Sequence, residues 1–213
     1  MEPAETPGVA IAISCNVPAG EVHPVVVNGI ELAAWRGHDG AAHLWEDRCP
    51  HRGMRLSFGF VRGDRLTCIY HGWEYGDDGA CRKVPAHPEM IPPASLCATV
   101  YPVSEKHGMI VMGSAPGARG GNGPWHGVRT VFIDLPADGV RDALPEISDA
   151  GWTARDEMFV GWRQGHVISL GVQPVSDART AVHVTTTNPD RDARVALARD
   201  LVAYRQDLTK GPA

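Results

Sequence analysis

The chain has 213 residues, 43% hydrophobic and 21% charged, which is enough apolar material to bury the core of one large or two small soluble domains. A formal net charge of −5, with both signs interspersed, argues against a non-specific nucleic-acid-binding protein. No apolar stretch approaches the roughly 20 residues that span a membrane, and the acidic start does not resemble a secretory signal. The five cysteines therefore do not indicate a disulfide framework, and we expect a cytoplasmic protein with no membrane partner.

Residues 20–112 consist of short apolar runs that are separated by turn-forming pairs. These pairs are Asn28-Gly29, Asp39-Gly40, Gly63-Asp64 and Asp78-Gly79. Such pairs between apolar runs are typical of antiparallel hairpins, and residues 101–113 (YPVSEKHGMIVMG) predict one more. We therefore expect residues 1–113 to form an antiparallel β domain.

The next segment, residues 114–127 (SAPGARGGNGPWHG), is rich in Gly and Pro and predicts a linker or a long loop. After it, residues 128–136 predict a strand. Residues 157–175 and 179–187 predict a pair of strands around the turn at Ser176-Asp177.

The end of the chain changes character. Residues 189–208 predict one amphipathic helix, because Pro189 lies near the expected start and apolar residues follow at helical spacing. Residues 128–213 therefore predict a second domain of the α+β type.

Two short motifs each place one cysteine beside one histidine. Cys49 and His51 form C-x-H, and Cys68 and His71 form C-x-x-H. Two thiolates and two imidazoles suit a four-coordinate zinc ion. Zinc fingers, however, usually group Cys with Cys and His with His, with the His pair on a helix, whereas hairpins are expected here. A zinc site, or purely structural Cys and His residues, is the alternative interpretation.

One cysteine and one histidine from each motif also suit a cluster of two metals, in which one iron takes both thiolates and the other takes both imidazoles. Imidazole in place of thiolate removes negative charge and raises the reduction potential, which is the chemistry of a Rieske [2Fe–2S] centre. Gly53 and Gly72, which closely follow the histidines, would let the loop backbones approach the inorganic sulfurs and donate N–H groups. The predicted ligands of this cofactor are Cys49, His51, Cys68 and His71.

The motifs C-P-H-R-G (49–53) and C-x-Y-H-G-W (68–73) resemble the Rieske domain of the Rieske non-haem iron oxygenases, which hydroxylate or demethylate aromatic and related substrates. Residues 47–86 are similar to that domain throughout, and residues 92–112 resemble the segment that follows it. The resemblance implies a Rieske-type antiparallel β domain, with cluster-binding hairpin loops, over residues 1–113.

The resemblance also indicates the subtype of the cluster. Rieske proteins of respiratory complexes carry two extra cysteines, joined as a disulfide, where this chain has Met54 and Tyr70. They also carry a serine that hydrogen-bonds a cluster sulfur, where this chain has Trp73, although Tyr75 is still available to bond a thiolate. Fewer donors stabilise the reduced cluster less, so we expect a potential near the bottom of the Rieske range of about −150 to +300 mV.

A complete oxygenase α-subunit of this family adds a catalytic domain, whose mononuclear iron is held by one carboxylate and by two histidines of a D-x-x-H-x-x-x-x-H motif. The histidines after residue 113 are His126, His166 and His183, and none lies within five residues of another. Residues 165–189 and the closing AYRQDL nevertheless resemble the late strands and the final helix of that domain. We expect residues 128–213 to be its reduced shell, a truncated catalytic-like domain without the iron-bearing middle.

Two histidines keep an alternative open. His166 and His183 lie on adjacent predicted strands, and with Asp134 or Asp156 they could hold an iron on this chain.

The other histidines and cysteines have plainer interpretations. His38 and His43 have the mutual spacing of iron ligands, but they flank a turn and are expected on a hairpin surface. We expect Cys15, Cys81 and Cys97 to be small residues that are buried or half-buried.

Three functions follow from these expectations. The favoured one is an electron-transfer subunit, whose cluster serves a mononuclear iron on a second oxygenase chain in a hetero-oligomer, with a ferredoxin or flavin reductase as electron donor. The second is a complete but atypical oxygenase with its own iron. The third is a regulatory or structural partner of an oxygenase, and a free-standing ferredoxin-like carrier remains besides these.

Overall fold

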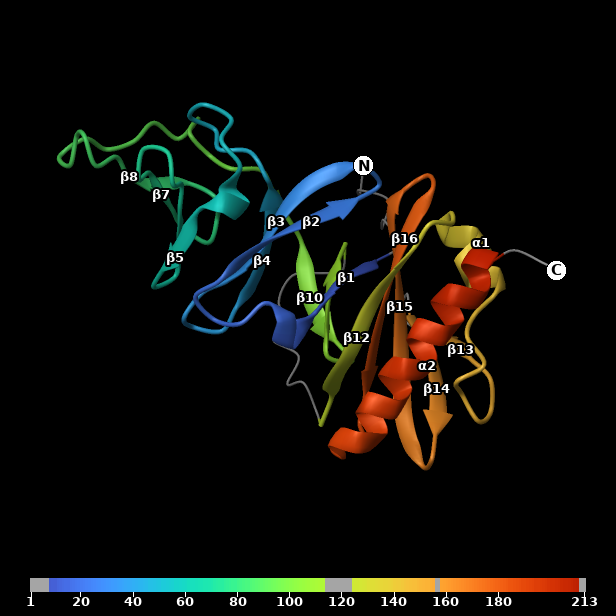
Figure 1. Cartoon of the computed structure of the whole chain (residues 1–213). Coiled ribbons are helices and arrows are strands. Elements are labelled where there is room, and N and C mark those ends of the chain that lie inside the picture. Colours follow the sequence, from blue (N-terminus) through green and yellow to red (C-terminus); the bar gives the residue numbers. More distant parts are fainter. Residues whose placement is uncertain (1–7, 114–123, 156–157, 211–213) are drawn as a thin grey trace, which may run out of the picture.

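The computed structural model describes residues 8–113, 124–155 and 158–210. Within these ranges the chain forms four antiparallel sheets and two α-helices (Figure 1). The prediction of a mostly β protein that ends in a helix is therefore confirmed. Neither helix in the described ranges is long and apolar enough to cross a membrane.

Two four-stranded sheets build the part of the chain that carries the cysteine–histidine motifs. The first has the order β2-β3-β4-β9, with strands β2 (Val22–Val27), β3 (Ile30–Arg36), β4 (Ala42–Glu46) and β9 (Val100–Tyr101). The second has the order β5-β6-β7-β8, with strands β5 (Phe60–Arg62), β6 (Arg65–Thr67), β7 (Glu74–Tyr75) and β8 (Cys81–Lys83). The short helices η1 (Ser14–Asn16) and η2 (Leu56–Phe58) precede β2 and β5.

The predicted turn pairs join these strands. Asn28-Gly29 connects β2 to β3 with φ angles of 49° and 76°, the left-handed conformation that both central residues of a type I′ hairpin require. The other three pairs lie between β3 and β4, β5 and β6, and β7 and β8. The two sheets share one core, whose fully buried side chains include Trp35, Trp45, Leu66 and Tyr75.

A three-stranded sheet connects this part to the C-terminal half. Its order is β1-β11-β10, with strands β1 (Val9–Ile13), β11 (Met109–Met112) and β10 (Val103–Lys106). The β10–β11 hairpin was predicted, and it turns at His107-Gly108. Ala10, Met109 and Val111 of this sheet form a buried cluster with Met158, so the first strand of the chain packs on the C-terminal sheet.

The C-terminal sheet has five strands in the order β12-β16-β15-β14-β13. They are β12 (His126–Ile133), β16 (Arg179–Thr186), β15 (His166–Ser176), β14 (Met158–Arg163) and β13 (Thr153–Arg155). Where one pair of strands was predicted, the chain makes three, because Gln164-Gly165 turns β14 into β15 with φ angles of 51° and 76°. The expected loop over residues 114–127 ends earlier, since β12 includes its last two residues, and residues 114–123 lie outside the described residues.

Helix α2 (Arg191–Lys210) lies across one face of this sheet (Figure 1). The predicted helix is thus confirmed, and it begins just after Asp190, whose Oδ1 accepts the N–H of Ala193 at 2.7 Å as an N-cap. Leu197 and Leu201 of α2 pack into a core with the apolar side chains of β12, β15 and β16. The short helix α1 (Ala137–Asp142) was not predicted, and it adds Val140 to the same core.

Candidate metal centre

Two loops of matching construction carry the four predicted ligands. In loop 1 (residues 49–54), the N–H of Cys49 donates to the carbonyl of Met54, and the N–H of Gly53 donates back to the carbonyl of Cys49, both at 2.8 Å. Loop 2 (residues 68–73) repeats both bonds between the equivalent residues, at 2.9 and 3.0 Å. Each loop thereby holds its cysteine at the base and turns its histidine outward.

A glycine in the left-handed conformation closes each loop. Gly53 has a φ of 73° and Gly72 a φ of 69°, where any other L-residue is strained. A Cβ atom on Gly72 would also approach Pro85 Cγ to 3.3 Å. These two positions therefore require glycine for the loop geometry itself.

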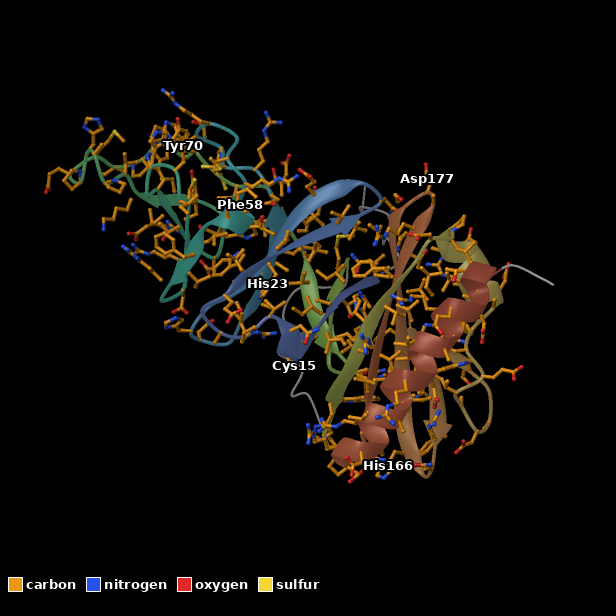
Figure 2. All side chains as sticks on the ribbon, viewed as in Figure 1. Cys15, His23, Phe58, Tyr70, His166 and Asp177 are labelled. Carbon is orange, nitrogen blue, oxygen red and sulfur yellow. The ribbon has the colours of Figure 1, made fainter. Side chains whose placement is uncertain are left out.

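The four candidate ligands divide into an inner and an outer pair. Cys49 and Cys68 are only 3% and 2% exposed, whereas His71 is exposed and His51 half-buried. The two imidazole centroids lie 4.7 Å apart. Two thiols are thus brought together under two imidazoles at one end of the molecule, near Tyr70 in Figure 2.

The cysteine sulfurs have hydrogen-bond donors around them. The hydroxyl of Tyr75 lies 3.1 Å from Cys49 Sγ, as the sequence had suggested. Burial raises the pKa of the Cys68 thiol and the nearby Cys49 raises it further, while the backbone N–H groups of Tyr70 and His71 lower it. Burial and the bond to Cys49 raise the pKa of Tyr75, so this hydroxyl keeps its proton.

The histidines are held by neighbouring rings. His51 stacks on Trp73, with ring centroids 3.9 Å apart and an interplanar angle of 6°. The ring centroids of Tyr70 and His71 also lie 3.9 Å apart, with the planes tilted by 31°. Partial desolvation lowers the pKa of His51, and His71 and Arg52 lower it further, which favours the neutral imidazole that a metal binds. A hollow of about 290 Å³ opens beside loop 1, with the exposed Arg48 and Arg52 in its wall.

This donor set fits a [2Fe–2S] cluster. Two buried thiols suit one iron, two outward imidazoles suit the other, and the hydroxyl and backbone N–H groups at the cysteines suit negatively charged sulfur. A zinc site would instead need all four donors around one point. Among the described residues, no three His, Cys, Asp or Glu side chains meet in that way.

The structure does not bring together the second pair of candidate ligands, His166 and His183. His183 pairs with Gly171 of β15, whereas His166 begins the same strand five positions earlier. That separation is roughly 17 Å along the strand, and an odd number of positions places the two side chains on opposite faces of the sheet. Asp134 instead forms an exposed ion pair at 3.7 Å with Arg179, and Asp156 lies outside the described residues.

His183 also has both ring nitrogens occupied. Its Nε2 lies 2.7 Å from Gln173 Oε1 and its Nδ1 lies 2.8 Å from Thr130 Oγ1. Gln173 Nε2 donates in turn to the carbonyl of Val26 in β2, at 2.7 Å. The neutral ring therefore donates from Nε2 and accepts at Nδ1, and burial lowers its pKa to about 4. His183 is a structural histidine that joins three strands.

Some residues lie elsewhere than expected. Cys81 is buried as predicted, but Cys15 and Cys97 are exposed, so the prediction for these two was wrong. Cys15 lies within η1, and Cys97 forms an isolated β-bridge with Ala80 shortly before β9. Their sequence neighbours gave no signal of this.

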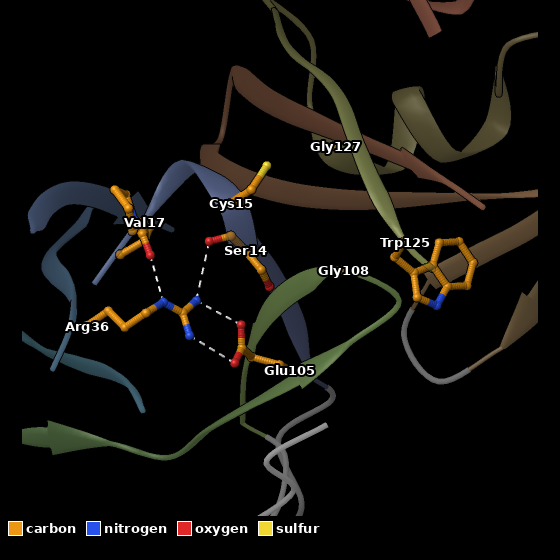
Figure 3. A pocket seen from close by; sticks show the side chains of 9 residues that line it. Ser14, Cys15, Val17, Arg36, Glu105, Gly108, Trp125 and Gly127 are labelled. Atoms are coloured by element: carbon orange, nitrogen blue, oxygen red, sulfur yellow. Dashed lines mark hydrogen bonds and ion pairs between the residues drawn. The ribbon is translucent and has the colours of Figure 1, made fainter. Parts of the chain in front are cut away.

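Sequence reasoning also missed a hollow of about 430 Å³ between the first and third sheets and β12 (Figure 3). In its wall, the guanidinium of Arg36 forms two hydrogen bonds with the carboxylate of Glu105, at 2.8 and 3.0 Å, and donates to the carbonyls of Ser14 and Val17. With its donors used in this way, Arg36 ties β3 to β10 and η1. No spacing rule in the sequence pairs these residues.

Comparison with known proteins agrees with the loop geometry. Residues 8–102 match the family described as the Rieske [2Fe-2S] domain. The oxidoreductase NdmD of Pseudomonas putida is 39% identical over 145 residues, which span 63% of this chain and 25% of that protein. Eight of the curated relatives that match this chain, NdmD among them, are covered over only 17% to 30% of their own lengths.

Solved structures extend the likeness beyond that domain. A Pseudomonas putida CBB5 NdmA mutant with theobromine superimposes with a TM-score of 0.72 at 18% identity, covering 94% of this chain and 80% of that one. Dicamba monooxygenase gives a TM-score of 0.71 at 18% identity, covering 97% and 87%. The fold of this chain, including its C-terminal sheet, is therefore like that of Rieske oxygenases.

Proposed function

We propose that this chain, whose residues 8–102 match the Rieske [2Fe-2S] domain, transfers electrons through such a cluster as one subunit of a Rieske-type oxygenase system. The observation that carries the proposal is the pairing of buried thiols with outward imidazoles in two loops of matching construction. When bound, the cluster supplies one-electron chemistry. The residues of the chain hold it, donate hydrogen bonds to its sulfur ligands and present two imidazole edges to a partner.

The ligands we assign are Cys49 and Cys68 for the inner iron and His51 and His71 for the outer one. The contact of Tyr75 with Cys49 is a side-chain donor to a sulfur ligand, and Trp73 stacks on His51 rather than donating to a sulfur. A site with few donors stabilises the reduced state weakly. We therefore expect a reduction potential near the low end of the Rieske range, suited to electrons from a ferredoxin or a flavin reductase.

We infer a division of labour along the chain, with residues 1–113 as the cluster domain and residues 128–213 as a truncated catalytic-like domain. The second part keeps a sheet covered by α2 but carries no D-x-x-H-x-x-x-x-H motif. Its opposite face leaves Trp162 53% exposed. An exposed tryptophan on a sheet face supports contact with another chain.

The mononuclear iron of the system is accordingly assigned to a partner oxygenase chain in a hetero-oligomer, and the reaction served is a hydroxylation or a demethylation. The exposed His71 supports a partner that approaches over loops 1 and 2. A cytoplasmic location belongs to the same proposal.

The test is an iron and sulfide count on protein purified without oxygen, followed by turnover assays. We expect two irons and two acid-labile sulfides per chain, and no product from aromatic or N-methyl substrates until a partner oxygenase chain is added. A colourless, zinc-loaded protein from an iron-replete host would contradict the cluster. Three irons per chain, with product from this chain alone, would instead favour an atypical complete oxygenase.

A further inference from the structure

Four aromatic rings link Cys49 to the far end of β4. The hydroxyl of Tyr75 lies 3.1 Å from Cys49 Sγ, and the rings of Tyr75 and Trp45 have centroids 6.5 Å apart. Trp45 meets Trp35 edge to face at 5.0 Å, and Trp35 stacks on His43 at 4.1 Å. The series is continuous from a candidate cluster ligand to the beginning of the strand.

The strand register produces this series. Trp35 of β3 pairs directly with His43 of β4, and Trp45, two positions further on, points to the same face. Tyr75 reaches the series from the second sheet, across their shared core. Trp35, Trp45 and Tyr75 are all 0% exposed, whereas His43 is half-buried, so the series reaches solvent at His43.

Filling the core does not by itself explain the two tryptophans. The indole N–H of Trp35 and that of Trp45 are both buried, and neither has a hydrogen-bond partner among the described residues. A buried indole N–H usually finds a partner, and leaving one unpaired is destabilising. A purely apolar side chain would fill the same space without that penalty, so two unpaired indoles in contact suggest a use for the rings.

The two ends of the series carry opposite charge. Burial lowers the pKa of His43 and the nearby Arg36 lowers it as well, while the exposed carboxylates of Asp39, Asp77 and Asp64 act on the ring in the opposite direction. The loop end carries the exposed Arg48 and Arg52 beside His51, against one half-buried carboxylate, Glu46. Two partners of different surface charge would therefore meet the molecule at different ends.

We propose that the rings of His43, Trp35, Trp45 and Tyr75 form an electron route to the cluster, and that the acidic surface around His43 docks a one-electron donor protein with a basic surface. The inference rests on the proposed function, because it needs the cluster at Cys49. One electron leaves a reduced iron–sulfur or flavin protein, which is oxidised, and reduces the cluster. No covalent bond changes, and the rings only bridge the gap. Loops 1 and 2 stay free for the partner that carries the mononuclear iron.

The route is tested by injecting electrons at two places in the cluster-loaded protein. A thiol-reactive ruthenium photosensitiser is attached either at Asp64→Cys, near His43, or at Arg52→Cys, in loop 1, with Cys15 and Cys97 replaced by Ser. Flash photolysis then measures the rate of cluster reduction. We expect Trp45→Leu to slow reduction from position 64 by roughly an order of magnitude and to leave the rate from position 52 unchanged.

Trp35→Leu is the second variant, because Trp35 lies one ring further from Cys49 along the series than Trp45 does. It should slow reduction from position 64 in the same way. Equal rates in wild type and variants from position 64 would overturn the route. An equal slowing from both positions would also overturn it, because the variant would then have changed the cluster itself. A protein without a cluster would instead refute the proposed function.

The docking surface is tested with cytochrome c, a basic one-electron protein that oxidises the reduced cluster. Asp64→Asn and Asp77→Asn together remove two charges while keeping an acceptor oxygen at each site. At low salt they should lower the bimolecular rate by about tenfold. Arg48→Gln, an exposed position outside loop 1, is the control and should not lower it. A rate that falls in the arginine variant and not in the aspartate variant would overturn the assignment of this face.

Discussion

The histidines of the two loops and the histidine at the centre of the C-terminal sheet differ in what their ring nitrogens have left to bind. His71 is exposed on loop 2 with the ring of Tyr70 tilted against it, and His51 stacks on Trp73. His183 is buried, and both of its nitrogens are taken by Thr130 and Gln173. The same residue type is therefore available for a metal in one place and committed to structure in the other.

Backbone geometry creates this difference. A tight loop closed by a left-handed glycine turns its histidine outward above a buried cysteine. A central strand buries its side chains between two layers of the fold. A polar ring there destabilises the fold unless it forms hydrogen bonds with its neighbours. Spacing in the sequence indicates a metal site only where the backbone leaves the donors free.

The sharpest way to break this comparison is to remove one histidine from each region. His71→Ala should abolish the electron-paramagnetic signal of the reduced cluster, because the outer iron would lose one of its two protein ligands. His166→Ala, in the sheet, should leave that signal at full strength. A signal that survived His71→Ala, or that vanished in His166→Ala, would reverse the assignment of the two regions.

The loops were the most predictable part of the molecule. Short-range signals specify them: the two motifs, the glycines that follow, and turn pairs such as Asn28-Gly29, each of which acts within a few residues of backbone. The C-terminal helix was predictable for the same reason, since its cap and apolar spacing are local. Tyr75 could be named from its position alone, and its bond to Cys49 is present.

The C-terminal sheet was harder, because its determinants are not local. Gln164-Gly165 is a weaker turn signal than Asn-Gly, so β14 and β15 were predicted as a single strand. The role of His183 depends on Thr130 and Gln173, which register brings together from distant positions. The suggestion of an iron ligand there followed from residue type without that register.

The next prediction measures how firmly the sheet depends on its histidine. His183→Ala should leave a cavity and remove the hydrogen-bond partner of Thr130 Oγ1 and of the buried Gln173 Oε1, destabilising the protein by about 3 kcal/mol. For a chain of this size, that lowers the melting temperature by about 6–12 °C. Calorimetry on the cluster-loaded protein measures it, with His166→Ala, at the half-buried start of β15, as the control. A change below about 2 °C would mean that the network contributes little.

Lowering the pH should reveal the structural role of His183 in the wild-type protein, because the buried ring stays neutral in the folded state. The folded-state pKa of His183 is about 4, below the ordinary value of 6.5, so the unfolded chain takes up this proton first. Stability from the neutral ring is therefore present above about pH 6.5 and is lost as the pH falls toward 4. Between about pH 7 and pH 5 the loss amounts to about 2 kcal/mol.

The measurement is the melting temperature against pH for the wild type and for His183→Gln, whose side chain does not titrate. Carboxylates that titrate in both proteins cancel in the difference between the two curves. We expect the wild-type curve to fall more steeply below about pH 6.5. Parallel curves would show that His183 is already protonated, or reached by water, in the folded protein.

The smallest expected effect separates tuning of the loops from stability of the sheet. Tyr75→Phe removes the hydroxyl that lies 3.1 Å from Cys49 Sγ and leaves the ring in place. The reduced cluster carries more negative charge, so a donor to its sulfur ligand stabilises the reduced state more than the oxidised one, and losing it lowers the potential. A difference of about 1 kcal/mol corresponds to about 40 mV for one electron. Protein-film voltammetry resolves that shift.

Thr130→Val, which removes a hydrogen bond from His183, is the matched control: it should lower the melting temperature and leave the potential unchanged. If Thr130→Val moved the potential as far as Tyr75→Phe does, the two regions would be coupled, and the contrast between a tuned loop and a committed sheet would have to be abandoned.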